Sequence, residues 1–221
     1  MLLVVAQQYN GHELWVTLAA LQRAQIGFDI VSTQLRIEDE ITFQPNLIEL
    51  TLDTLDPEVM QTDKYDGIIV VSGNMALTEA YWDDERVLRL IRDADTRKKI
   101  VAAICCSVPT IREAARGKRV SFFPLIRSRE RLVNAGAILS NISCTVDDRL
   151  ITAEHQMSSQ IWAEAIATAL HGRESSLVPG LVDSGMVPNK RERMPDPDIE
   201  RLKHVKTKIR KPDSEFIKRK G

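Results

Sequence analysis

The feature that most constrains the fold is a repeated alternation of short apolar runs with longer amphipathic stretches. Strand-like runs occur at 2–6 (LLVVA), 28–33 (FDIVST), 47–55 (LIELTLDTL), 66–73 (DGIIVVSG) and 100–104 (IVAAI). Helical periodicity marks HELWVTLAALQRA (12–24) and DDERVLRLIRDADTRKK (83–99) between them. Strands that alternate with helices form parallel sheets with helices on both faces. The chain is therefore expected to form an α/β sandwich with a mostly parallel central sheet.

The last third of this pattern carries its own boundary signals. Asp147 and Asp148 separate ISCTV from RLIT, which predicts a hairpin at that point. The stretch SSQIWAEAIATALHG (158–172) predicts a final helix.

The charge distribution changes near Gly172. Residues 1–172 carry 17 Lys and Arg against 23 Asp and Glu, a net charge of −6, whereas residues 173–221 carry 13 against 8, a net charge of +5. The second segment also holds five of the nine prolines. We therefore expect one α/β domain over 1–172 and a basic, proline-containing C-terminal extension over 173–221 that is not an independent domain. Apolar spacing in DPDIERLKHVKTKIRK predicts a helix within the extension.

Several classes of function lack the composition they require. The net charge of −1 gives no argument for a membrane or nucleic-acid partner. No apolar run approaches the roughly 18–20 residues of a membrane helix, and the first residues lack the pattern of a signal peptide. Three cysteines without regular spacing make neither a disulfide framework nor a zinc site. We expect a cytoplasmic protein without metal or cofactor.

Two of the three cysteines are adjacent, in VAAICCSVPTIREAARG, where a strand gives way to a helix predicted over 107–116. Ligands of open α/β sheets gather at such carboxyl ends of strands. Unpaired N–H groups at a helix start stabilise a thiolate, so a lowered pKa is expected for Cys105. Cys106 is then a packed neighbour, and a disulfide between the two would strain the intervening peptide. The alternative is a pair of inert buried cysteines.

The order of these segments resembles the ThiJ/PfpI superfamily, which shares its fold with class I glutamine amidotransferases. VAAICCSVPTI is similar to the family's nucleophile elbow, and KYDGIIVVSGN to its Y-D-x-hydrophobic-P-G-G strand and turn. GKRVSFFP, NAGA and VDDRLITA are similar to further family segments in the same order, so the resemblance spans about residues 1–171. It implies a flavodoxin-like three-layer sandwich, a nucleophile elbow after a central strand, and a homodimer.

The resemblance also implies roles for two residues. Cys105 matches the family's reactive cysteine, and Glu13 matches the glutamate that sits against that thiol. Glu13 opens the helix after the first strand, so it too lies at the carboxyl edge of the sheet. The alternative to a role beside the thiol is a structural glutamate whose negative charge interacts favourably with the helix dipole. A carboxyl beside a thiol can move its proton. We expect hydrolase or lyase chemistry on a small carbonyl, amide or nitrile-like substrate.

The chain departs from the family pattern in the turns around this site. Ser72-Gly73-Asn74 stands where the family has Pro-Gly-Gly, and Ser107 stands where the elbow has glycine. The backbone N–H of Gly73 or Asn74, with that of Cys106, is expected to form an oxyanion hole.

Histidines that family members place near the cysteine are replaced by Cys106 and Phe123. His155, in ITAEHQMSS, is therefore a candidate base for Cys105, and the alternative is a loop histidine that faces solvent.

These departures from the family pattern leave a second function open. The chain would then be a catalytically degenerate subunit with a structural, assembly or redox-sensing role, and residues 173–221 would bind its protein partner.

Overall fold

A computed structural model describes residues 1–42 and 45–172 of the chain. The expected extension over 173–221, with its helix, lies outside these residues. Within the described ranges the main sheet consists of β1 (Leu2–Val5), β2 (Asp29–Ser32), β5 (Leu50–Thr51), β6 (Gly67–Val71), β7 (Ile100–Ile104), β10 (Cys144–Asp147) and β11 (Leu150–Ala153). Two small ladders pair β3 (Arg36–Glu38) with β4 (Pro45–Leu47) and β8 (Arg119–Val120) with β9 (Ile138–Leu139).

The helices lie between these strands in the predicted alternation. They are α1 (Gly11–Arg23), α2 (Met75–Glu79), α3 (Glu85–Thr96), α4 (Ile126–Asn134) and α5 (Ser159–His171). Short 3-10 helices are η1 (Val59–Gln61), η2 (Ala80–Asp83), η3 (Cys105–Ile111) and η4 (Gln156–Ser158). No helix in the described ranges is long and apolar enough to cross a membrane.

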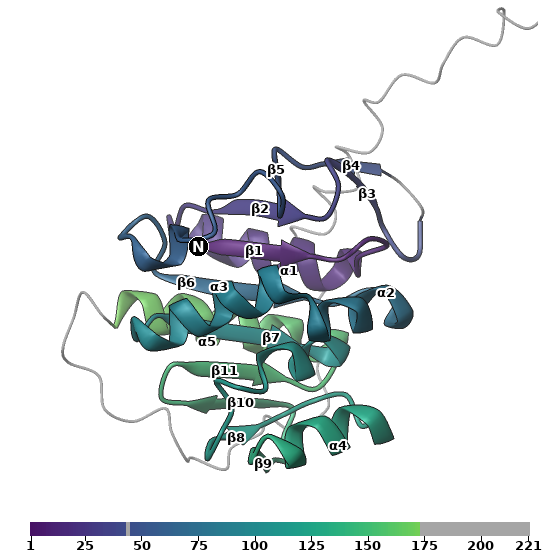
Figure 1. Cartoon of the computed structure of the whole chain (residues 1–221), viewed down its shortest axis with the longest axis vertical. Helices are drawn as coiled ribbons and strands as arrows, with labels where there is room; N and C mark the ends of the chain where they lie inside the picture. The colour runs from purple at the N-terminus through teal and green to yellow at the C-terminus, as the bar shows by residue number, and fades with distance from the viewer. Residues whose placement is uncertain (43–44, 173–221) are drawn as a thin grey trace, which may run out of the picture. The chain divides into compact units, whose positions relative to one another are not determined.

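The main sheet has the order β10-β11-β7-β6-β1-β2-β5, and β10 is its antiparallel strand (Figure 1). Its central strands are buried on both faces, as their continuous apolar composition predicts. In β1, for example, Leu2 and Val4 join one core while Leu3 and Val5 join the other. Residues of α3 pack into the first core, and residues of α1 and α5 pack into the second. The three-layer α/β sandwich is confirmed.

Two local predictions have different outcomes. The hairpin at Asp147–Asp148 is confirmed, because β10 pairs antiparallel with β11 and Asp148 adopts a φ of +56° in the turn. The segment 47–55, predicted as one half-exposed or edge strand, supplies the edge strand β5 at Leu50–Thr51, but the prediction that the strand continues to residue 55 is wrong. Hydrogen bonds between Thr51 and Thr54, including one of 3.0 Å between their hydroxyls, close a turn at the end of β5. Threonine hydroxyls here compete with the strand for backbone groups.

The carboxyl ends of the central strands meet at one edge of the sheet. Val5 of β1 lies beside Val71 of β6, and Ile104 of β7 lies beside Ala153 of β11. Residues that directly follow these strands are therefore brought together, although they are far apart in the sequence.

Candidate functional site

Cys105 occupies a strained turn between β7 and η3. Its φ is +59°, whereas Ile104 before it is extended. A side chain in this left-handed region costs about 1–2 kcal/mol relative to the ordinary conformation. Strain of this kind persists only where the surrounding structure imposes it, and it is concentrated at functional sites. The residue is partly exposed.

Ser107 ties the turn to the neighbouring strand. Its Oγ lies 2.6 Å from the carbonyl oxygen of Ile104 and 2.8 Å from that of Val70 in β6, and it accepts the Ile104 N–H at 3.2 Å. The helix predicted over 107–116 is corrected by this structure. It begins at Cys105 itself, and η3 ends at Ile111. The serine that replaces the family's glycine therefore anchors the turn.

Glu13 is fully buried at the first turn of α1. Its N–H donates to Oδ1 of Asn10, the residue that caps the helix, at 3.1 Å. Its carboxyl oxygen Oε2 accepts two hydrogen bonds from Ser72, one from the hydroxyl at 2.6 Å and one from the backbone N–H at 3.1 Å. Within the described residues Oε1 has no conventional hydrogen-bond partner. The carboxyl also interacts with the Cys105 thiol.

Burial raises the pKa of Glu13 to about 8, although the hydroxyl of Ser72 opposes that rise. A carboxyl without nearby positive charge is easier to bury when it is neutral. The pKa therefore lies close to neutral pH, where a group can both accept and release a proton.

The two thiols share one ionisation. A hydrogen bond from the Cys105 thiol lowers the pKa of Cys106 to about 7, and Ser72 and Thr78 assist while burial opposes. That same hydrogen bond, burial and the Glu13 carboxylate raise the pKa of Cys105. The lowered pKa expected for Cys105 assumed an isolated thiol, whereas here the two adjacent thiols titrate together. Cys106 is 4% exposed, and in its thiol form it donates to the carbonyl oxygen of Gly73 at 3.7 Å.

Two expected oxyanion donors are already engaged within the protein, which corrects that part of the predicted site. The N–H of Gly73 donates to Oγ1 of Thr78 at 3.0 Å, and that of Asn74 donates to the carbonyl oxygen of Gln8 at 2.8 Å. The loop before α1 is packed tightly on this turn, since a Cβ on Gly73 would lie 2.1 Å from the Gln8 oxygen. The backbone N–H of Cys106 remains the candidate donor.

His155 follows β11, so it lies at the same edge as Cys105. Its Nδ1 accepts the N–H of Met157 at 3.0 Å, which gives the imidazole a capping position at the start of η4. Gln156 beside it accepts a hydrogen bond of 2.8 Å from Nδ2 of Asn10, which links η4 to the start of α1. A base at His155 would therefore have to act through Nε2, and its role stays a prediction.

Ser72 is the functional candidate that sequence reasoning missed. The sequence did show a serine where the resemblance expects proline, but its contact with Glu13 spans 59 positions and depends on the packing of β6 against α1. A polar residue directly after a buried strand, at the edge that carries the cysteine, was the available signal.

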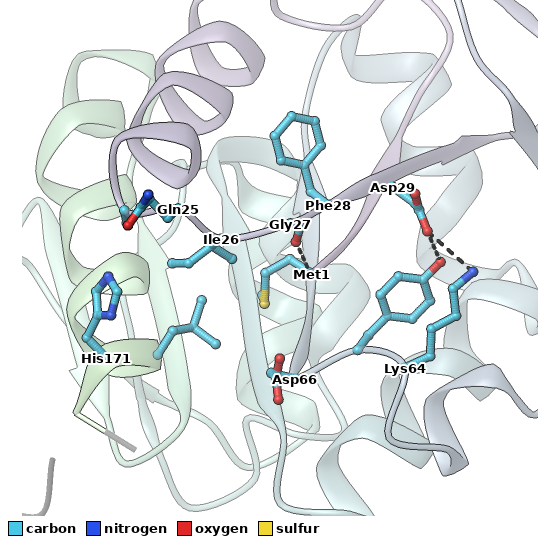
Figure 2. A pocket seen from close by; sticks show the side chains of 12 residues that line it. Met1, Gln25, Ile26, Gly27, Phe28, Asp29, Lys64, Asp66 and His171 are labelled. Atoms are coloured by element: carbon cyan, nitrogen blue, oxygen red, sulfur yellow. Dashed lines mark hydrogen bonds and ion pairs between the residues drawn. The ribbon is translucent and has the colours of Figure 1, made fainter. Parts of the chain in front are cut away.

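A separate pocket of about 760 Å³ lies at the opposite edge of the sheet, where β1 and β2 begin (Figure 2). On one side of it Asp29 accepts a hydrogen bond from the Tyr65 hydroxyl at 2.5 Å and pairs with Lys64 at 3.4 Å. Its lining includes neither Glu13 nor the cysteine pair. Among the described residues, no group of three or more His, Cys, Asp or Glu side chains is placed to hold a metal ion.

Comparison with known proteins supports the resemblance seen in the sequence. The model of the DJ-1/PfpI family matches residues 1–169. The structure is similar to a ThiJ/PfpI domain protein from Brachyspira murdochii, with a TM-score of 0.68 and 18% identity over 77% of this chain and 95% of that one. It is also similar to Drosophila melanogaster DJ-1beta, with a TM-score of 0.65 and 22% identity over 78% and 90%.

A curated relative from Methanocaldococcus jannaschii, described as an uncharacterized protein, is 24% identical over 177 residues, which are 77% of this chain and 81% of the relative. The family match covers most of the chain, and both solved structures have the same fold. The chain belongs to the DJ-1/PfpI family.

Proposed function

We propose that this protein is a cysteine-dependent hydrolase or lyase that acts on a small carbonyl, amide or nitrile-like substrate through Cys105. The observation that carries the proposal is the pairing of a partly exposed cysteine residue on a left-handed turn with a buried carboxyl. Cys105 is the more exposed of the two adjacent residues, since Cys106 is almost fully buried. Access favours Cys105 as the nucleophile even though Cys106 ionises more readily.

Glu13 is the proton partner of this nucleophile. As the sulfur of Cys105 bonds to a carbonyl carbon, the π pair of that carbonyl moves to its oxygen and the thiol proton passes to the ionised carboxyl. Protonation of the oxygen then completes the addition. A pKa of about 8 makes Glu13 suited to both transfers, and the Cys106 thiolate is a second acceptor beside the same proton. The candidate donor to the developing oxyanion is the N–H of Cys106.

The test is the pH dependence of iodoacetamide labelling at each cysteine, resolved by mass spectrometry. Cys105 is expected to react first, and Glu13→Gln is expected to shift its profile because the carboxyl no longer accepts the proton. Glu130→Gln, which removes an exposed carboxyl on α4, is the matched control.

Turnover of a 1,2-dicarbonyl, a primary amide and a nitrile would then be measured with wild type and Cys105→Ala. A Cys105 that labels no faster than Cys144 would contradict the proposal.

A second candidate function is supported by a specific observation. The engaged N–H groups of Gly73 and Asn74 leave the site with fewer oxyanion donors than the turn suggested. A catalytically degenerate subunit with a structural, assembly or redox-sensing role would need no oxyanion donors. Its protein partner would bind residues 173–221. Homodimer formation and a cytoplasmic location stay predictions, to be measured by sedimentation and by imaging of a tagged chain.

A further inference from the structure

Ser72 supplies two hydrogen-bond donors that a proline cannot supply. The family turn has proline at this position, and proline has neither a backbone N–H nor a hydroxyl. In this chain Ser72 follows β6 directly and is 1% exposed. Both of its donors are directed to the same atom, Oε2 of Glu13, at 2.6 and 3.1 Å.

These contacts close a ring of hydrogen bonds around the start of α1. The carbonyl oxygen of Ser72 accepts the N–H of Asn10 at 2.8 Å, and Oδ1 of Asn10 accepts the N–H of Glu13 at 3.1 Å. The carboxyl of Glu13 then returns to Ser72 through Oε2. Each residue of the ring fixes the next, so the carboxyl has little freedom to rotate.

The two carboxyl oxygens therefore have different chemistry. Two donors already point at Oε2, so a proton on that atom would face both of them. A neutral acid would then place its proton on Oε1, the buried oxygen that has no hydrogen-bond partner among the described residues. Titratable groups that act on this carboxyl are Cys105 and Cys106 of η3, whereas the residue after β6 is the uncharged Ser72.

We propose that Ser72 is a positioning residue that holds Oε2 of Glu13, so that Oε1 is the carboxyl oxygen that takes up and releases the proton. This inference rests on the proposed function, in which Glu13 is the proton partner of the nucleophile. It assigns to this chain a way of holding the glutamate that the family's proline does not provide.

The test is a pH titration of Glu13 in the full chain. Carbon-13 NMR of the glutamate side-chain carboxyls measures its protonation at each pH. Glu13→Gln identifies the signal by its loss. Ser72→Ala removes the hydroxyl, and the midpoint of Glu13 is expected to rise by about one pH unit, because a hydrogen bond to a charged group favours the ionised form. Ser72→Thr keeps a hydroxyl and is expected to restore the wild-type midpoint. Labelling rates would not suffice, since Ser72 also acts on both thiols.

An unchanged midpoint in Ser72→Ala, or an equal rise in Ser72→Thr, would overturn the proposal. Circular dichroism establishes that each variant is folded. If Ser72→Ala does not fold, Ser72→Thr and Ser72→Val give a pair of equal shape that differs only in the hydroxyl. Failure of the proposed function is a separate result, because the NMR titration needs no reaction at Cys105.

Discussion

Replacing Glu13 by glutamine should change how the stability of this protein depends on pH. The carboxyl is fully buried, and its pKa rises from an ordinary value of 4.5 to about 8 on folding. A raised folded-state pKa contributes stability that is fully present below the unfolded value and is lost as pH rises through the folded value. The sensitive window therefore runs from about pH 4.5 to about pH 8.

The size of the effect follows from the same two values. One pKa unit corresponds to about 1.4 kcal/mol, so the full loss across the window is at most about 5 kcal/mol. Glutamine resembles the neutral acid, because its Oε1 can accept both donors of Ser72 and it does not ionise. Wild type should lose a few kcal/mol of unfolding free energy between pH 5 and pH 9 that Glu13→Gln does not lose. The difference reports the carboxyl together with its effect on the titration of the two thiols.

Urea denaturation followed by far-ultraviolet circular dichroism, at each pH from 5 to 9, measures this difference. Glu130→Gln removes an exposed carboxyl and controls for the change in net charge. Its stability should follow that of wild type across the range. A constant difference between Glu13→Gln and wild type would refute the reasoning, because it would mean that Glu13 has the same proton occupancy in the folded and unfolded chain.

Three further substitutions test the packing and the charge of the site. Gly73→Ala should lower the unfolding free energy by about 1–3 kcal/mol in urea titrations, because its Cβ would meet the Gln8 carbonyl. Ser107→Gly should lower it by about 1–3 kcal/mol in the same assay, because buried backbone groups lose their partner. Cys106→Ala should lower the pKa of Cys105, since its hydrogen bond to Cys106 is removed, and pH-resolved labelling at Cys105 measures that change.

The layered fold could be predicted because it depends on patterns that are local in the sequence. Continuous apolar runs such as 100–104 can only be buried on both faces, and the amphipathic segment 83–99 has one face for a core. The segment 47–55 shows the limit of this reasoning. Its period-two pattern predicts a strand, but the hydroxyls of Thr51 and Thr54 satisfy backbone groups in a turn, and the sequence does not show which alternative is more stable.

The residues of the site could be placed at one edge because parallel strands carry their ends to the same side. Cys105, Glu13 and His155 each follow a strand of the central sheet or open the helix after it. Hydrogen-bond partners could not be predicted in this way. Whether the N–H of Gly73 is free depends on Thr78, five residues later in α2, and on a contact of 3.0 Å that follows only from the complete turn.

The charge state of the cysteine pair is the property of the site that the sequence predicts least well. A helix start predicts a lowered pKa at Cys105 because of the nearby backbone N–H groups. This prediction includes no effect of neighbouring ionisable side chains. In the structure the second thiol and the Glu13 carboxyl lie within interaction range, so three ionisable groups compete for the few donors in a buried space. Ser72 interacts with all three of them. Burial and the hydrogen bond between the two thiols have the largest effects on these pKa values, and Ser72 favours the ionised form of each group. Neither the elbow motif nor the helix start specifies these contacts.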